Sequence, residues 1–246
     1  MAESLKTAVI LAAGLGSRLG ELKENRPKAF VTIGGVSLID RSIQLLVDKG
    51  ITKIIIGTGY LSEQFDELTN SYPQVVTFKN PIYDKTGSMY TLFVLRELIE
   101  EPFLLLEGDL LYEPSALDYV LEDETENIIL ASDATHSGDE VFIQSGKDRS
   151  LEKMNKDKSK LKKISGELVG ISKLTPRALK AMVTFAQQQY NNDNHQIHYE
   201  DVLVGIAHEV ALNVKVVNDM AWCEIDDPSH LKRAVSEVYP KILARS

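Results

Sequence analysis

A loop of small residues follows an apolar run near the start of the chain, and two cationic side chains come soon after it. The apolar run covers residues 8–13, glycines stand at Gly14 and Gly16, and Arg18 and Lys28 follow. Glycine permits backbone angles that a β-carbon forbids, and successive exposed amides make an anion-binding concavity. Two cations beside such a concavity would balance the charge of a polyphosphate. We therefore expect Arg18 and Lys28 to contact phosphates.

Two widespread phosphate-binding loops do not fit this stretch. The dinucleotide-binding spacing would place a third glycine at position 19, which is Leu19, and no clear acidic ribose ligand follows the second strand. A P-loop would end in Gly-Lys-Ser or Gly-Lys-Thr, and that ending is missing. A dehydrogenase of the Rossmann type is accordingly a distant alternative.

Carboxylates stand at two expected strand ends. Asp109 follows the apolar run 103–106 and a glycine, and Asp226 ends the run that begins at Trp222. Carboxylate oxygens over a sheet edge would hold a divalent metal. The structural alternatives are helix caps, with Asp109 capping a helix that begins near Pro114 and Asp227 capping the last helix. If the two strand ends meet, Asp109 and Asp226 form a two-carboxylate magnesium site.

Short apolar runs alternate with amphipathic stretches through the first half of the chain. Strands that are nearly all apolar are typical of a parallel sheet covered on both faces. Such a sheet binds ligands beyond the carboxyl ends of its strands, which puts the glycine loop and Asp109 on one rim. Extended segments are expected at 8–13, 29–33, 53–58, 75–78, 103–106, 127–132, 140–144, 168–172, 213–217 and 222–225, and helices at 37–49, 62–68, 88–100, 175–190, 199–208 and 228–243.

The composition describes an ordinary globular protein with an acidic balance. Its 246 residues are 43% hydrophobic and carry a formal net charge of -9. That acidity argues against unspecific binding to nucleic acid or to an anionic membrane. The one cysteine, Cys223, excludes an intramolecular disulfide and fits a reducing, cytoplasmic setting. No apolar run suits a signal peptide or a membrane span.

No linker or internal repeat divides the chain. We expect a single domain over residues 1–246, with residues 140–165 as a flap-like excursion. Residues 146–163 are dense in Lys, Asp, Glu and Ser and poor in apolar side chains, which favours a solvated hairpin.

The opening loop and the strand-end acids together resemble a known family. Leu11–Leu19 with Arg26-Pro27-Lys28 resembles the signature of nucleotidyltransferases of the nucleoside-diphosphate-sugar pyrophosphorylase type. The triplets Glu107-Gly108-Asp109 and Glu224-Ile225-Asp226 are similar to that family's metal-binding segments. The resemblance implies an α/β fold, with a Rossmann-like, mixed and mostly parallel sheet flanked by helices. It also implies attack by a substrate phosphoryl oxygen on the α-phosphorus of a nucleoside triphosphate, with release of pyrophosphate.

The resemblance implies roles for single residues. Arg18 would hold the β- and γ-phosphates, and Lys28 would hold the α-phosphate and the incoming phosphoryl group. Asp109 and Asp226 would bind Mg²⁺. The backbone of Ala12, Ala13 and Gly14 would cradle the base and ribose, and Gly16 is also expected to take part in nucleotide binding.

The segment 84–92 stands where this family reads the base. Thymidylyl- and uridylyltransferases for sugars usually show a Gln-Pro and a Gly-Leu-Ala pattern there, and both are absent. The segment is similar to that of the small cytidylyltransferases that activate phosphocholine, 2-aminoethylphosphonate or inositol phosphate. Gly87 and Ser88 are the candidates for contacts with the base.

An acceptor site is suggested by Tyr199, Glu200 and Asp201, which follow a polar loop and open a helix. An aromatic ring and two carboxylates would suit an ammonium group through charge and cation–π attraction. The alternative is an acidic first turn that the helix dipole favours.

We therefore predict a Mg²⁺-dependent cytidylyltransferase that couples CTP to 2-aminoethylphosphonate or phosphocholine. The alternatives are a sugar-1-phosphate or inositol-phosphate nucleotidyltransferase and, in a different class, a non-catalytic nucleotide-binding module. The expected partners are CTP and a small phosphorylated or phosphonylated amino alcohol, without nucleic acid or membrane. A homodimer is left open.

Overall fold

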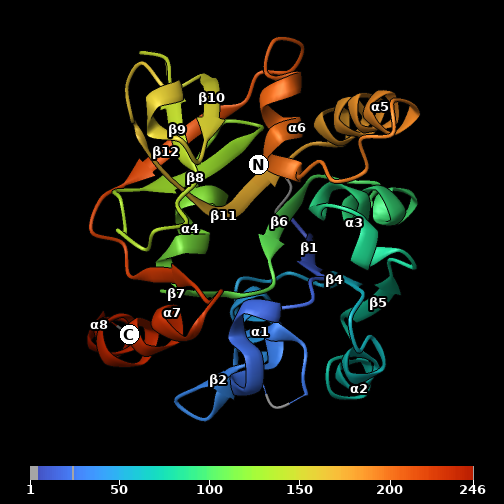
Figure 1. Cartoon of the computed structure of the whole chain (residues 1–246), viewed down its shortest axis with the longest axis vertical. Coiled ribbons are helices and arrows are strands. Elements are labelled where there is room, and N and C mark those ends of the chain that lie inside the picture. The colour runs from blue at the N-terminus through green and yellow to red at the C-terminus, as the bar shows by residue number, and fades with distance from the viewer. Residues whose placement is uncertain (1–4, 24, 246) are drawn as a thin grey trace.

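The chain folds as strands and helices around one central sheet (Figure 1). The computed structural model describes residues 5–23 and 25–245, so the two ends of the range 1–246 lie outside the described residues. The strands are β1 (Thr7–Ala12), β2 (Thr32–Ile33), β3 (Val36–Ser37), β4 (Lys53–Thr58), β5 (Val75–Lys79), β6 (Phe103–Glu107), β7 (Leu110–Tyr112), β8 (Ile128–Ser132), β9 (Phe142–Ser145), β10 (Leu151–Asn155), β11 (Gly166–Leu174), β12 (Asn213–Val217) and β13 (Trp222–Glu224). The α-helices are α1 (Leu38–Asp48), α2 (Glu63–Ser71), α3 (Ser88–Leu95), α4 (Ser115–Leu121), α5 (Pro176–Asn191), α6 (Tyr199–Ile206), α7 (Pro228–Arg233) and α8 (Tyr239–Arg245). Short 3-10 turns include η1 (Ser17–Lys23) and η2 (Lys28–Phe30), and a π-helical turn, η6, covers Ala234–Val238.

The first strand of the chain lies inside the parallel part of the sheet. β5, β4, β1 and β6 are neighbours in that order and run in the same direction. All six residues of β1 are buried, because β4 and β6 pair with its two edges and helices cover its faces. The loops that follow β1 and β6 therefore leave the sheet at one rim.

The other half of the sheet is mixed. β11 runs antiparallel to β6, β8 and β9, while β12 runs parallel to β8. The register of β11 against β8 shifts between Leu168 and Ser172. Gly170 lies in this bulge with φ 82°, and a β-carbon there would collide with the carboxylate of Glu107. The bulge thus makes room for an acidic side chain at the end of β6.

Two apolar layers cover the two faces of the sheet. Alternate residues of β1 belong to different layers: Val9 and Leu11 pack with α3, α5 and α6, and Ala8 and Ile10 pack with α1, α2 and α4. This alternation follows from the two-residue period of a strand. In Figure 1 the helices α3, α5 and α6 lie together on one side, away from α1 and α4.

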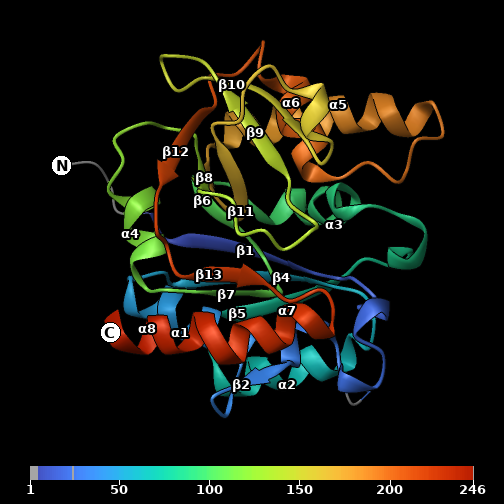
Figure 2. The ribbon, with the colours of Figure 1, turned by 60° about the vertical axis from the view of Figure 1, so that its left-hand side comes forward.

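A smaller layer joins the end of the chain to the middle of the molecule. β7 pairs antiparallel with β13, and Figure 2 shows the two strands side by side along α7 and α8. Leu110 is opposite Glu224, and the backbone N–H of Ile225 donates to the carbonyl of Asp109 at 3.0 Å. This ladder brings together two acidic segments that lie more than a hundred residues apart in the sequence.

Most of the predicted elements are confirmed. The strands at 53–58 and 213–217 match at both ends, and α1 follows Ser37, whose hydroxyl accepts the N–H of Asp40 at 3.1 Å. Residues 29–33 differ, because they begin in the turn η2 and only their last two residues are a strand. The last helix also differs, because the π-helical turn η6 interrupts it.

The segment 140–165 contributes two strands to the central sheet. β9 and β10 form a hairpin, and β9 pairs with the first residues of β11. Leu151 and Met154 are buried in the layer that contains α5 and α6, although charged residues surround them in the sequence. Among the described residues, no helix is both long and apolar enough to cross a membrane.

Candidate active site

A cavity of about 380 Å³ opens at the carboxyl ends of β1 and β6. The loop after β1 forms one wall, to which Ala12, Ala13, Gly14 and Gly16 all contribute. Gly16 has φ 58°, and a β-carbon there would lie 3.1 Å from Cβ of Lys28. A side chain at this position would therefore be strained and would press on the lysine. The glycine lets the loop and Lys28 share one corner of the cavity.

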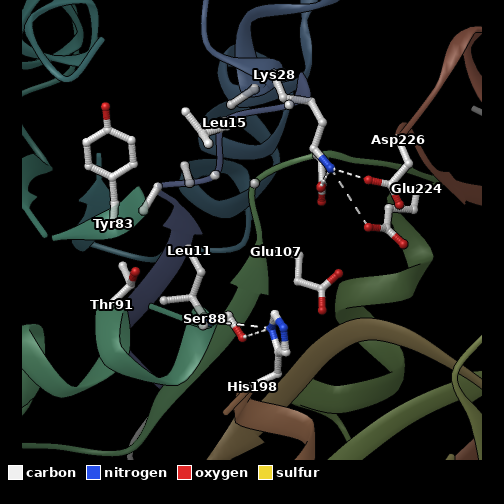
Figure 3. Close-up of a pocket in the computed structure, with 18 of the residues that line it drawn as sticks. Leu11, Leu15, Lys28, Tyr83, Ser88, Thr91, Glu107, His198, Glu224 and Asp226 are labelled. Carbon is white, nitrogen blue, oxygen red and sulfur yellow. Dashed lines mark hydrogen bonds and ion pairs between the residues drawn. The ribbon is translucent and has the colours of Figure 1, made fainter. Parts of the chain in front are cut away.

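The start of α3 forms the opposite wall. Gly87 and Ser88 line the cavity there, together with Tyr83 and Thr91. A β-carbon on Gly87 would collide with the backbone carbonyl of Ile197, so a glycine is required by the close approach of the segment before α6. Figure 3 shows Tyr83, Leu11 and Ser88 around one end of the cavity.

Ser88 is held by the start of α6. Its hydroxyl accepts the N–H of Tyr199 at 3.1 Å and lies 3.3 Å from Nδ1 of His198. The N–H of Ser88 also points at this ring nitrogen, at 3.4 Å (Figure 3). His198 itself lines the cavity.

Lys28 lies among three carboxylates at the other end of the cavity (Figure 3). Its Nζ is 2.6 Å from Oδ1 of Asp226 and 3.9 Å from Oε1 of Glu224, and it also contacts Asp109. The β7–β13 ladder brings these acids together, because Asp109 precedes β7, Glu224 is the last residue of β13 and Asp226 follows it. The two predicted strand ends are thus brought together, and Lys28 joins them.

The charges in this corner do not balance. Burial would lower the pKa of Lys28, but Asp109, Asp226 and Glu224 outweigh it and raise that pKa, so the lysine is a cation. Burial, followed by repulsion from Asp109 and Glu107, raises the pKa of Glu224 well above its usual value. Asp109, Asp226 and Glu224 outnumber the two cations that contact them, Lys28 and, at Asp226, Arg18, which favours the entry of a further cation.

The oxygens that remain in this corner fit a hard divalent cation. Oδ1 of Asp109 and Oδ2 of Asp226 are buried and lack a hydrogen-bond partner among the described residues. One oxygen each from Glu107, Asp109 and Glu224 lie within 4.8 Å of one another. Buried polar atoms are normally paired, so oxygens left open at one point suggest a ligand. Carboxylate oxygens are what Mg²⁺ binds.

The mouth of the cavity carries a second group of ions. Arg18 donates to Oδ2 of Asp139 at 2.6 Å and to Oδ1 of Asp226 at 2.8 Å. Lys156 donates to the other oxygen of Asp139 at 2.5 Å. All four residues line the cavity.

A smaller chamber of about 70 Å³ adjoins this cavity and is rich in acids. Glu107, Glu167, Glu200 and Glu224 all line it, together with Trp222. The hydroxyl of the buried Tyr199 donates to Glu107 at 2.6 Å. Burial raises the pKa of Glu167 to about 7, and burial is also the main reason for the raised pKa values of Glu107 and Glu200.

Comparison with known proteins identifies the family. Residues 8–171 match the model of a MobA-like NTP transferase domain, which is more than half of the chain. The chain belongs to this NTP transferase family.

Relatives of this NTP transferase include cytidylyltransferases. The choline-phosphate cytidylyltransferase of Streptococcus pneumoniae is 30% identical over 220 residues, which are 89% of this chain and 92% of the relative. The 2-aminoethylphosphonate cytidylyltransferase of Lancefieldella rimae is 26% identical over 230 residues, which are 91% of this chain and 89% of the relative. A solved structure of the CTP:phosphocholine cytidylyltransferase from Streptococcus pneumoniae has a TM-score of 0.79 and 26% identity, covering 94% of this chain and 97% of that one. The predicted family, the predicted fold and the prediction of a nucleotidyltransferase are confirmed.

Most of the predicted site residues of the NTP transferase line one cavity. The two predicted residues that are not among the residues lining it are in α6. Tyr199 is buried and bonds Glu107, and Asp201 accepts the N–H of His198 at 3.3 Å as part of the helix cap. The cavity is lined by the other predicted residues: Ala12, Ala13, Gly14, Gly16, Arg18, Lys28, Gly87, Ser88, Asp109, Glu200 and Asp226.

Several residues of the cavity were not singled out from the sequence. Glu107 and Glu224 belong to the triplets quoted for the family resemblance, and their place two residues before each aspartate was the available signal. Asp139 and Lys156 stand in polar stretches without a local pattern that marks them, whereas His198 directly precedes the predicted acceptor helix, and that position was its signal. They reach the cavity only through the pairing of β8, β9 and β11 and through the packing of α6.

Proposed function

We propose that this NTP transferase joins CTP to a small phosphonate or phosphate that carries an ammonium group. The meeting of Lys28, Asp109, Glu224 and Asp226 beside the β1 loop is the observation that carries the proposal. Lys28 supplies a cation and the three acids supply oxygens that can bind a metal, at the place where the triphosphate of a nucleotide on that loop would lie. The cytidylyltransferase relatives support CTP as the nucleotide.

The nucleotide would lie between the two walls of the cavity. The base and ribose would rest on the backbone of Ala12, Ala13 and Gly14, with Gly87 and Ser88 opposite. Arg18 stands at the mouth, where it would bind the β- and γ-phosphates. Lys28 stands deeper, where it would contact the α-phosphate and the phosphoryl group of the acceptor.

The reaction needs positioning and charge neutralisation more than proton transfer. An oxygen of the acceptor phosphonate or phosphate forms a bond to the α-phosphorus of CTP, and the bond from that phosphorus to the bridging oxygen breaks. Pyrophosphate leaves with the electron pair. The attacking oxygen is already ionised near neutral pH, so no general base is required. Lys28 and Arg18 stabilise the charge that moves onto the pyrophosphate.

Magnesium would be held by Asp109, one oxygen of which lies within 4.8 Å of an oxygen each of Glu107 and Glu224, and by Asp226, which offers a buried oxygen without a hydrogen-bond partner among the described residues. When bound, it would neutralise phosphate oxygens and make the α-phosphorus more electrophilic. Lys28 contacts three of these carboxylates and keeps their charges close together. The orientation of the carboxylates is therefore fixed by the protein itself.

The acidic chamber supports an acceptor with a primary ammonium group. Among the described residues that line it, the acids outnumber the one cationic side chain, Lys156. Glu200 reaches both the chamber and the main cavity. A quaternary ammonium is usually bound by several aromatic faces. Here Trp222 is the aromatic residue among the described residues that line the chamber, whereas five of those residues are acids. N–H donors would pair with those carboxylates, which favours 2-aminoethylphosphonate over phosphocholine.

The experiment is a pyrophosphate-release screen of CTP, UTP, ATP and dTTP against five acceptors. These are 2-aminoethylphosphonate, phosphoethanolamine, phosphocholine, inositol phosphate and glucose 1-phosphate. We expect turnover with CTP and 2-aminoethylphosphonate at the highest kcat/KM, and a lower value for phosphocholine. Faster turnover of UTP or dTTP with a sugar phosphate would instead identify a sugar nucleotidyltransferase. Binding of CTP by calorimetry without turnover of any acceptor would refute the proposed acceptors.

A further inference from the structure

Asp139 bridges two cations across the mouth of the main cavity. One carboxylate oxygen accepts from Arg18 at 2.6 Å and the other from Lys156 at 2.5 Å. The three residues come from distant parts of the chain: Arg18 from η1, Asp139 from the connection between β8 and β9, and Lys156 from the residue after β10. Both cations are more than half exposed, with side-chain exposures of 56% and 59%, whereas Asp139 is 21% exposed.

This arrangement is the one that a phosphate group would adopt between the same two side chains. A phosphate binds cations through separate oxygens, as the carboxylate of Asp139 does here. The second terminal nitrogen of Arg18 is also engaged, at 2.8 Å from Asp226. A polyphosphate that enters the cavity would therefore meet cations that are already paired, beside the negative charge of Asp139.

The backbone around Asp139 is held by hydrogen bonds, whereas the contacts of its carboxylate with described residues are those with Arg18 and Lys156. The carbonyl of Ser137 lies 3.2 Å from Nε2 of the buried His230, and the carbonyl of Thr135 accepts from Arg233 at 2.8 Å. The N–H of Gly138 donates to Glu140 at 3.1 Å. The carboxylate of Asp139 can consequently leave Arg18 and Lys156 by rotation of its side chain, with the backbone in place.

We propose that Asp139 is a displaceable counter-anion that the triphosphate of the substrate replaces. Without nucleotide it keeps Arg18 and Lys156 together at the cavity mouth. When a triphosphate arrives, Arg18 and Lys156 exchange the carboxylate for phosphate oxygens. The exchange weakens binding of both the triphosphate and the pyrophosphate product, and it speeds release of the product. Asp139 is thus a positioning residue, and this assignment rests on the proposed function only in taking the ligand to be a triphosphate.

The test compares the binding of inorganic tripolyphosphate to the wild type and to Asp139→Asn by titration calorimetry in magnesium buffer. The variant keeps the size of the side chain and removes the competing charge. We expect it to bind tripolyphosphate about 3- to 10-fold more tightly, with a smaller difference at high salt, because partly exposed charges are screened. Asp139→Ser is a second variant that removes the charge in a different way.

A matched control is Asp123→Asn, since Asp123 also bridges two cations, Arg149 and Lys215, but is not among the residues that line the cavity. Its affinity for tripolyphosphate should equal that of the wild type. Equal or weaker binding by both Asp139 variants would overturn the proposal, because Asp139 would then help to hold the ligand. Absence of tripolyphosphate binding to every protein would overturn it as well.

Steady-state kinetics separate this role from a structural one. Asp139→Asn should lower the KM for CTP about 3- to 10-fold and increase inhibition by pyrophosphate by a similar factor, with kcat unchanged or lower. A structural defect would raise KM or lower the melting temperature instead. Tripolyphosphate has neither base nor acceptor, so its binding tests Asp139 even if the nucleotide and acceptor proposed above are wrong.

Discussion

Two groups of charged side chains use the same residue types and differ in how completely they are paired. Asp123, near the end of α4, accepts from the N–H and hydroxyl of Thr125 with one oxygen and from Arg149 and Lys215 with the other. In the cavity, Asp109 and Asp226 each have one buried oxygen without a hydrogen-bond partner among the described residues. The first group can hold the chain together and offers little to a ligand. The second group has oxygens left to bind one.

The comparison explains why charge clusters alone do not mark a site. Both groups would look alike in the sequence, as scattered acids and bases. The two groups differ in whether buried carboxylate oxygens are left without a hydrogen-bond partner. Burying such oxygens lowers the stability of the fold. A chain that keeps open oxygens at the end of a cavity has kept them for a ligand, and this makes the two groups a test pair for mutation.

The largest effect on activity is expected from substitution of Asp109 or Asp226. Changing either residue to Asn removes a charged oxygen from the group that would hold the metal, and we expect kcat to fall about 10³-fold, or about 4 kcal/mol in the barrier. Pyrophosphate release measures the loss, and removal of metal by EDTA should abolish turnover of the wild type. Full activity in the double variant would show that these carboxylates are not the metal site.

Substitution of Lys28 should have the next largest effect on activity, and the thermal stability of the variant should depend on the metal. Lys28→Met leaves Asp109 and Glu224 without their cation and Asp226 with Arg18 alone, so we expect about 10²-fold lower kcat/KM and a lower melting temperature. Magnesium should raise the melting temperature of the variant more than that of the wild type. In the variant the metal has to offset the repulsion among the carboxylates without the help of Lys28. Scanning calorimetry with and without MgCl₂ checks this. Equal shifts in the two proteins would show that Lys28 and the metal act at separate places.

The fold and part of the site were predictable because their causes are local. Apolar runs such as 53–58 mark buried strands, and Asp109 and Asp226 come at the ends of such runs. The contact between Asp109 and Asp226 depends on the β7–β13 ladder, whose three-residue strands are too short to show a period in the sequence. Asp139 and Lys156 meet Arg18 from far along the chain, through the pairing of the β9–β10 hairpin with β11, which no local pattern shows. The stated alternative for Asp201 was an acidic first turn favoured by the helix dipole, and the structure adds a specific contact, because the Asp201 carboxylate accepts the N–H of His198.

Glu200 and Asp201 offer a smaller test within one turn of helix. Glu200 lines both cavities, whereas the carboxylate of Asp201 caps α6. We expect Glu200→Gln to raise the KM for 2-aminoethylphosphonate about 10- to 100-fold, with little change in the KM for CTP, because a charged hydrogen bond to the ammonium is lost. Asp201→Asn keeps an oxygen for the cap and should change neither value by more than about twofold. An equal rise in KM for an acceptor without an ammonium group would contradict this role of Glu200.

The smallest effect on activity is expected at Asp123, which belongs to the fully paired group outside the cavity. Asp123→Asn should leave kcat and KM unchanged and cost about 1 kcal/mol in the free energy of unfolding at pH 7, since its cations are partly exposed to solvent. Burial would raise the pKa of Asp123, but Arg149 and Thr125 outweigh it and lower that pKa. A lowered carboxyl pKa contributes stability above the ordinary pKa of aspartate and loses it as the pH falls toward the folded-state value. The difference between wild type and variant in urea unfolding should therefore be full at pH 7 and shrink below about pH 4. A difference that stays constant with pH would mean that Asp123 stabilises the fold through packing rather than through its charge. The group around Asp123 would then differ from the group in the cavity in the type of interaction as well as in how completely its charges are paired.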